Sequence, residues 1–307
     1  MSFEQNLEFF EIMSSRRRQV AEKDLQWLVY IAENPAAGSY SEHGSVGIDR
    51  ADLGPLFQIA RLPWTLNRIP IGYSGLAQAY SRSESAAIDA VAENMKDGTK
   101  ALQRNMNLQM LSDGVGNLNG PNPELKVGGT DLTGVQAMFD DGADVGMYAG
   151  IDRGTAVYWR SFVLRSPVAT PRPITEELLW QVWNEAALRQ FSITQATMSR
   201  GVLTQAALLL GQQRRFNFDG TSTPQFHAGA DSVHFNGVEL TGISAYENGR
   251  IDLWDEDLMD WNVLLDFTVE DRDGGNLDRS VLFAKVYSQM SYRTPFQSAS
   301  IRDLISS

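Results

Sequence analysis

The amino-acid sequence predicts an α+β fold, and three observations carry that prediction. Residues 82–111 contain no proline and place apolar side chains at helical spacing. Two shorter helical patterns follow potential N-caps at Thr175 and Ser199. Near its end the chain alternates apolar and polar side chains, which is the period of β-strands. We therefore expect a long helix, then a two-helix region, then late antiparallel strands.

Length and composition narrow the class of protein. The 307 residues are about twice a ~150-residue domain, which predicts one large or two modest domains. A net charge of −12 argues against a general nucleic-acid binder, because such a protein presents a basic face to phosphate. The absence of cysteine excludes disulfides, cysteine-ligated metals and thiol catalysis. No stretch approaches the ~20 apolar residues of a membrane span, and the acidic N-terminus is unlike a secretory signal, so a cytoplasm-like compartment is expected.

Residues 2–34 are interpreted as a helix-biased arm with a charged centre. Apolar residues keep helical spacing at both ends, namely Phe3, Leu7 and Phe10, then Leu25, Leu28 and Val29. Between them lie Arg16, Arg17 and Arg18. These arginines have two interpretations, contact with a polyanion or pairing with acidic neighbours in an assembly. The acidic balance of the chain favours the second.

Residues 35–80 have a different character. Repeated glycines and prolines exclude a long helix, while 57–62 and 64–71 resemble the strands of an extended hairpin. A compact domain seldom contains so long a stretch with little core pattern. We therefore expect a projecting two-stranded loop whose apolar residues are buried by a partner. These residues are Leu56, Phe57, Trp64, Ile69 and Ile71.

The long helix over 82–111 is the strongest local prediction. The sequence Ser-Arg-Ser-Glu at 81–84 fits a capping box, and 30 helical residues would span about 45 Å at ~1.5 Å per residue. Gly98 is a weak point in the middle, because glycine costs a helix interior about 1 kcal/mol relative to alanine. The helix is expected to stop at Asp113-Gly114.

Shorter elements follow. The helix after Thr175 should bury Leu178, Val182, Trp183 and Ala186, and the helix after Ser199 should bury Val202, Leu203, Ala206, Leu209 and Leu210. Asn236-Gly237 between alternating apolar residues predicts a β-hairpin. Strands over 263–269 and 281–293 should pair across a turn at 271–276. Leu282, Ala284, Val286, Met290 and Tyr292 would share one face of the second of these strands.

No sequence pattern predicts a catalytic, cofactor or metal site. The Gly-Tyr-Ser-Gly run at 72–75 misses a nucleophile elbow by one position, and the glycine-rich run at 114–120 follows a helix, unlike a dinucleotide fingerprint. His43, His227 and His234 lack metal-ligand spacing. The acidic groups at 255–260 and 270–273 fit no calcium loop, so they are interpreted as solvated turns. The lack of any strong site favours a structural role.

The order of these segments resembles a known family, the major capsid proteins of tailed phages with the Hong Kong 97-like fold. Residues 103–116 (QRNMNLQMLSDGVG) look like the family's spine helix and the glycine-rich turn that follows it. Residues 267–276 (FTVEDRDGGN) and 281–295 (VLFAKVYSQMSYRTP) look like its late turn and long final strand. The run HFNG at 234–237 resembles a hairpin common in these subunits.

This resemblance implies roles for each part of the chain. Residues 1–34 would be the N-arm, 35–81 the E-loop over a neighbouring subunit, 82–119 and 248–307 the P-domain, and 120–247 the A-domain. The implied function is self-assembly into hexamers and pentamers of an icosahedral virion shell, formed in the host cytoplasm. The shell would enclose double-stranded DNA without specific binding. Implied partners are other copies of the chain, a portal protein, and a separate scaffold or decoration protein. Arg16, Arg17, Arg18, Phe57, Trp64 and Ile69 are the candidate assembly residues.

Two departures from the family limit what carries over. No lysine lies between Lys23 and Lys96, so the loop cannot supply the lysine crosslink that some members form. The chain starts at the arm, which implies a separate scaffold or none. Two alternatives stay open: an encapsulin-type compartment shell, and a metal- or carboxylate-dependent enzyme built on 255–260 with His227 and His234.

Overall fold

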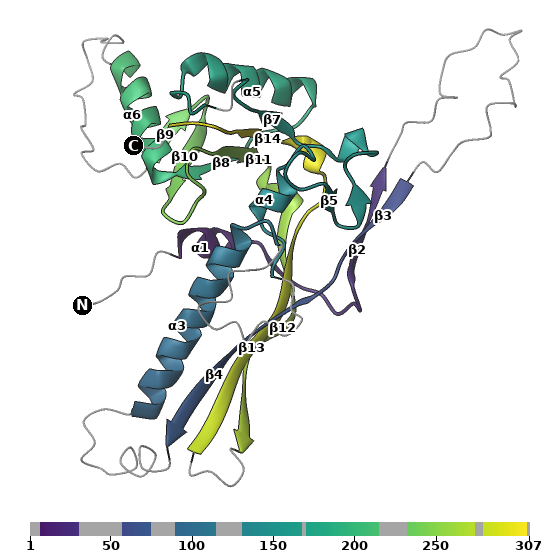
Figure 1. Cartoon of the computed structure of the whole chain (residues 1–307), viewed down its shortest axis with the longest axis vertical. Coiled ribbons are helices and arrows are strands. Elements are labelled where there is room, and N and C mark those ends of the chain that lie inside the picture. The colour runs from purple at the N-terminus through teal and green to yellow at the C-terminus, as the bar shows by residue number, and fades with distance from the viewer. Residues whose placement is uncertain are drawn as a thin grey trace, which may run out of the picture.

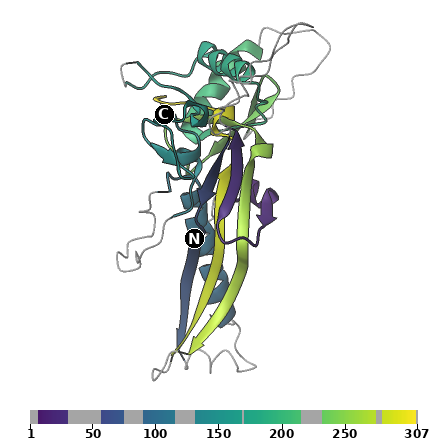
Figure 2. The same cartoon turned by 90° about the vertical axis from the view of Figure 1, so that its right-hand side faces the viewer.

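The computed structural model describes residues 7–30, 57–74, 90–114, 131–167, 170–214, 232–273 and 279–305. They form two bodies, an elongated one built on a four-stranded sheet and a rounder one built on a six-stranded sheet (Figures 1 and 2). We call these the long-sheet body and the six-stranded body. Each has its own cluster of buried apolar side chains. None of the helices in the described ranges is long and apolar enough to cross a membrane.

The long-sheet body contains the longest strands. Its strand order is β1 (Arg17–Gln19), β12 (Met259–Asp273), β13 (Arg279–Tyr292) and β4 (Thr65–Ser74). Strands β12 and β13 pair antiparallel, which confirms the predicted late pairing and extends it at both ends. Every second residue of β13 from Leu282 to Tyr292 is buried, so the expected face is confirmed.

Helix α3 (Ala90–Met110) lies along this sheet (Figure 1), with α1 (Glu8–Ser15) near its C-terminal end. Leu102, Met106 and Met110 follow one another at the predicted helical spacing, and all three are buried in the core of the long-sheet body. The predicted capping box at 81–84 lies outside the described residues. The short helix α4 (Val135–Met138) follows across the end of α3, where the Gln136 backbone N–H donates to the Ser112 carbonyl (3.3 Å).

The six-stranded body has the strand order β7 (Phe162–Leu164), β14 (Ser298–Ile301), β11 (Ile251–Trp254), β8 (Gln195–Ser199), β10 (Val238–Ile243) and β9 (Ser232–Phe235). Helices α5 (Glu176–Leu188) and α6 (Arg200–Arg214) pack against it. The β9–β10 hairpin turns at Asn236 (φ 48°) and Gly237 (φ 82°), as the sequence predicts, because this turn needs two positive φ angles.

The caps of the two helices differ. Thr175 caps α5 as predicted, since its hydroxyl accepts from the Leu178 backbone N–H at 3.3 Å. Of the predicted α5 stripe, Val182, Trp183 and Ala186 are buried, but Leu179 is buried in place of Leu178. The expected cap at Ser199 is wrong. Its hydroxyl is buried in β8 and has no hydrogen-bond partner among the described residues.

Two expectations about the first 80 residues are also wrong. The stripe at 25–29 belongs to a strand, β2 (Leu25–Tyr30), and not to a helix. It pairs antiparallel with β3 (Phe57–Leu62), whereas the sequence analysis paired 57–62 with 64–71. The segment after β3 instead joins the long sheet as β4, beside β13. Strands β3 and β4 therefore lie where the sequence predicted strands, at 57–62 and 64–71. Their pairing partners differ from the prediction because pairing depends on distant residues.

The expected domain boundaries do not follow the two bodies. Strands β11 and β14 were placed in the P-domain with 248–307, yet they are inner strands of the six-stranded sheet. Conversely, the described residues 131–159 were placed in the A-domain, yet Leu132, Phe139 and Trp159 are buried in the long-sheet body. In this segment β5 (Met147–Tyr148) and β6 (Ile151–Asp152) form a small hairpin. The chain therefore crosses between the two bodies more often than the expected division into four domains allows.

Candidate assembly surfaces

The three arginines at 16–18 bind acidic groups of their own chain. Arg16 Nε lies 2.8 Å from Glu256 Oε1, and its Nη1 lies 3.1 Å from Asp257 Oδ1. Arg18 Nη1 lies 3.0 Å from Asp260 Oδ2. The acidic run at 255–260 is thus a partner for arginine, and not the freely solvated turn that was expected.

Arg17 makes two different contacts. It pairs with Asp266, and its guanidinium carbon lies 5.8 Å from the centre of the Trp261 ring. These side chains meet because β1 runs parallel to β12, with Arg17 opposite Trp261. The hydrogen bond from Arg17 lowers the pKa of Asp266, and that from Arg16 lowers the pKa of Glu256. All three arginines therefore pair with acidic groups of their own chain, whereas the expectation was pairing between subunits of an assembly. An assembly role for these arginines stays a prediction.

The β2–β3 ladder presents an apolar face to the outside. Cross-strand pairing sets Leu28 opposite Ile59 and Tyr30 opposite Phe57. These four side chains are 51%, 43%, 76% and 53% exposed. We call them the outward face of the ladder. Because side chains alternate along a strand, all four lie on the same side.

The inward face of the same ladder is packed. Leu25, Val29, Ala60 and Leu62 are buried, and the Trp27 ring lies 6.4 Å from that of Tyr148. The Trp27 indole N–H donates to the Arg293 carbonyl at 3.0 Å. The ladder is therefore fixed to the long-sheet body and holds its outward face in one orientation.

Two of the predicted assembly residues are contacts within the chain. Trp64 and Ile69 are half-buried and pack against the core of the long-sheet body. The Trp64 indole N–H donates to the Glu22 carbonyl at 2.9 Å. Ile71, also expected to be buried by a partner, is 6% exposed in the single chain. Of the candidate apolar residues that the structure describes, Phe57 is the most exposed, and an assembly role for Phe57, Trp64 and Ile69 stays a prediction.

Sequence reasoning missed the other three members of the outward face. Leu28 was assigned to a helix, and Tyr30 and Ile59 were not singled out. The period-two alternation of Leu28 and Tyr30 was the available signal, but six residues are too few to separate a strand from a helix by spacing.

The histidines and acidic groups that were considered as metal ligands form no metal site within the described residues. No group of three or more His, Asp or Glu side chains there is arranged to hold a metal ion. His234 is exposed on β9, while His43 and His227 lie outside the described ranges.

The architecture, with a long helix on a long twisted sheet and a second α/β body, is that of the Hong Kong 97-like capsid fold. Solved structures of this fold match nearly the whole chain. One is a chain of the cyanophage A-1(L) capsid, with a TM-score of 0.76 and 14% identity over 99% of this chain and 94% of that one. A capsid chain of a native GTA particle has a TM-score of 0.62 and 10% identity, over 99% and 92%.

An encapsulin also matches. The SrpI encapsulin of Synechococcus elongatus has a TM-score of 0.57 and 10% identity, over 99% of this chain and 89% of that one. No family model and no curated protein matches the sequence. The chain therefore has the Hong Kong 97-like fold, as the sequence analysis predicted, and identities this low establish the fold alone.

Proposed function

We propose that this chain is the major capsid protein of a tailed phage, which assembles with copies of itself into the hexamers and pentamers of an icosahedral shell around double-stranded DNA. The observation that carries the proposal is the match of 99% of the chain to a phage capsid chain. The shared fold runs over nearly the whole of both chains, 99% of this one and 94% of that one.

The outward face supports self-assembly. A folded monomer seldom holds several large apolar side chains together in solvent on one rigid ladder. Burying a large apolar side chain contributes about 1.5–3 kcal/mol. Even a modest interface of this kind stabilises a closed shell, because it is repeated at every subunit. We assign a second copy of the chain as the partner of this face.

The domain roles are proposed with revised boundaries. The N-arm comprises residues 1–24, the E-loop starts at β2 and continues through β3, and the long sheet with α3 forms the P-domain. The six-stranded body, including β11 and β14, forms the A-domain. A portal protein, a separate scaffold or decoration protein and a location in the virion belong to the same proposal.

The test is electron microscopy of the purified chain after expression, followed by nuclease treatment of particles from infected or induced cells. Closed particles of uniform diameter that protect double-stranded DNA are the expected result. A soluble chain that stays monomeric at high concentration, with and without co-expressed neighbouring phage genes, would contradict the proposal.

The encapsulin match supports a second candidate, a compartment shell. The phage capsid match has the higher TM-score, 0.76 against 0.57, so the virion is preferred. The same purified particles separate the two candidates. A nuclease-protected genome identifies a virion, whereas a co-purifying enzyme without nucleic acid identifies a compartment.

A further inference from the structure

Three neighbouring strands of the six-stranded body each carry an arginine at the same end of the sheet. Arg165 follows β7, Arg302 follows β14, and Arg250 precedes β11. The strand register pairs the last residue of β14 with the last residue of β7 and with the first residue of β11. The three arginines therefore form a row along one end of the sheet.

All three arginines reach a loop that belongs to the long-sheet body. Arg302 Nη2 donates to the Phe139 carbonyl at 2.9 Å, and Arg250 Nη2 donates to the same oxygen at 3.3 Å. Phe139 is fully buried, and its ring lies 5.1 Å from that of Tyr292, edge to face. The arginines thus bridge from one body to the core of the other.

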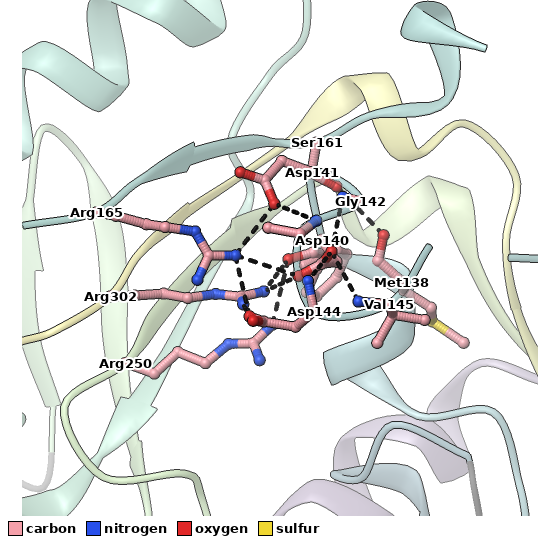
Figure 3. A network of polar contacts seen from close by, with 12 residues as sticks. Met138, Asp140, Asp141, Gly142, Asp144, Val145, Ser161, Arg165, Arg250 and Arg302 are labelled. Carbon is pink, nitrogen blue, oxygen red and sulfur yellow. Dashed lines mark hydrogen bonds and ion pairs between the residues drawn. The ribbon is translucent and has the colours of Figure 1, made fainter. Parts of the chain in front are cut away.

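Asp140 lies at the centre of this contact (Figure 3). Its carboxylate is fully buried, and Oδ1 accepts from the backbone N–H groups of Gly142 (2.7 Å), Asp144 (3.3 Å) and Val145 (3.1 Å). Oδ2 lies 2.8 Å from Arg302 Nη2 and 3.5 Å from Arg165 Nη2, as an ion pair without an aligned hydrogen bond. One buried carboxylate thus shapes the loop and also pairs with two of the arginines, Arg165 and Arg302.

Two further carboxylates complete the contact from the same loop. Arg165 Nη2 lies 3.1 Å from Asp141 Oδ1 and 3.0 Å from Asp144 Oδ2. Arg302 also pairs with Asp144. We call this set, Asp140, Asp141 and Asp144 with Arg165, Arg250 and Arg302, the Asp140 clasp.

The loop side of the clasp is held from within its own body. Arg153 is fully buried and donates to the carbonyls of Met138 (2.9 Å) and Val145 (3.1 Å), one on each side of Asp140. Burial lowers the pKa of Arg153 to about 10, so it remains a cation at neutral pH. The loop that carries Asp140 is therefore held in place by Arg153, a residue of the same body, and the three arginines of the six-stranded body bind to a loop that is already fixed.

From this geometry we infer that the Asp140 clasp fixes the angle at which the six-stranded body stands on the long-sheet body. Apolar packing is non-directional and lets two bodies rotate at small cost, whereas buried ion pairs with forked donors fix an orientation. In a shell, the angle between the bodies of each subunit determines how subunits meet and hence the curvature. This second step rests on the proposed function.

The angle can be measured in the single chain. The chain contains no cysteine, so Asp97→Cys on α3 and Leu188→Cys on α5 give two unique, exposed sites for spin labels. Double electron–electron resonance then reports the distance between the two bodies. Arg165→Gln is the main variant, because this side chain is 31% exposed and its loss leaves Arg250 and Arg302 in place. Asp140→Asn is the stronger variant.

We expect one narrow distance distribution in the parent chain, and a shifted or broadened one in Arg165→Gln and Asp140→Asn. Arg165→Lys should return most of the narrow distribution, because Arg165 reaches its three carboxylates through the single atom Nη2 and a lysine ammonium restores that charge. Lys285→Gln is the control, because its ion pair with Glu270 lies inside the long-sheet body. If Asp140→Asn fails to fold, the distance distribution of Arg165→Gln alone tests the inference. A folded Arg165→Gln chain with the parent distribution would overturn the inference.

The consequence for assembly is read from particle diameter by electron microscopy. Arg165→Gln should give particles of altered or mixed diameter, and Lys285→Gln particles of parent diameter. Uniform parent-size particles from Arg165→Gln would contradict the link to curvature. Should the parent chain form no particles, the proposed function fails, while the distance measurement still tests the clasp.

Discussion

Gly134 lies against the C-terminal end of α3 and leaves no room for a side chain. A β-carbon there would lie 2.4 Å from the Ser112 carbonyl oxygen and 2.6 Å from those of Gln109 and Met110. Its φ of −97° is open to any residue, so the restriction is purely one of space. Backbone carbonyls at a helix end cannot move aside as a flexible side chain would.

Gly134→Ala should therefore destabilise the chain by about 3 kcal/mol, the upper range for overpacking a tight site. Urea denaturation followed by circular dichroism measures the loss. Gly146→Ala is the matched control, because no atom lies within 4 Å of its added β-carbon and the residue is exposed. Equal denaturation midpoints for the two variants would contradict the close approach.

At Gly98 the structure reverses the effect on stability that helix propensity predicts for a substitution by alanine. The sequence alone suggests that alanine would stabilise this helix interior by about 1 kcal/mol. In the structure a β-carbon at Gly98 would lie 2.6 Å from Ile71 Cδ1 and 2.7 Å from Cγ1. Ile71 is buried and β-branched, so its side chain has little freedom to move.

We expect Gly98→Ala to destabilise the chain by about 1–2 kcal/mol in the parent background. In an Ile71→Ala background the same change should be neutral or stabilising, because the clash is gone and propensity remains. A double-mutant cycle from urea denaturation measures this coupling. Additive effects of the two substitutions would show that the two residues do not meet.

At the scale of elements, the arm is attached in two ways. Helix α1 is anchored by the buried side chains of Phe9, Phe10 and Met13, whereas residues 16–24 are held by charge more than by strand pairing. Strand β1 has only three residues, all exposed, and its neighbours are the ion pairs of Arg16, Arg17 and Arg18. The pKa values of Glu256 and Asp266 are lowered in the folded chain by these arginines. A carboxyl with a lowered pKa stabilises the fold above its unfolded pKa, about 4 here, and this stabilisation is lost as the pH falls through the folded value.

Acid should therefore release residues 16–24 before the sheets unfold. Hydrogen exchange of the peptide covering 16–24, corrected for the intrinsic effect of pH, should show clear protection at pH 7 and little at about pH 3. A Glu256→Gln, Asp266→Asn double variant should lose this protection already at pH 7. Unchanged protection in that variant would show that packing alone retains the arm.

At the scale of the whole molecule, substitutions on the outward face should affect assembly much more than the folding of the single chain. Phe57→Ser with Ile59→Ser removes apolar surface that is about half exposed in the single chain, so the free energy of unfolding should fall by no more than about 2 kcal/mol. Particle yield should fall at least tenfold, because the lost burial recurs at each subunit. Sucrose-gradient sedimentation measures the yield.

Gln26→Ser is the control for that experiment, since it changes an exposed polar residue of β2 and should leave the yield unchanged. Parent-level particle yield from the double serine variant would rule out the outward face as an interface between copies. Loss of yield from both variants would show that the ladder is sensitive to any change.

How far the sequence predicted the structure differs from element to element. The Thr175 cap, the Asn236-Gly237 turn and the alternation along β13 were predicted because each is set by residues close in the chain. The pairing of β2 with β3 was not predicted, because 26 residues separate the two strands and contacts with distant residues, such as those of Trp27 with Tyr148 and Trp159, hold the pair in place. For the same reason Trp64 was expected at an interface, although it packs within its own chain.

The sequence by itself determined the α+β class, the long helix, the late strands and, through their order, the Hong Kong 97-like fold. Local spacing is enough for these features, because helix and strand periods and turn residues act within a few positions. Only the tertiary structure decided which acidic group meets each arginine, which apolar side chains stay in solvent, and how the two bodies are joined. The Asp140 clasp shows the reason. Arg165, Arg250 and Arg302 are far apart in the chain, and a row of arginines exists only after three strands have paired.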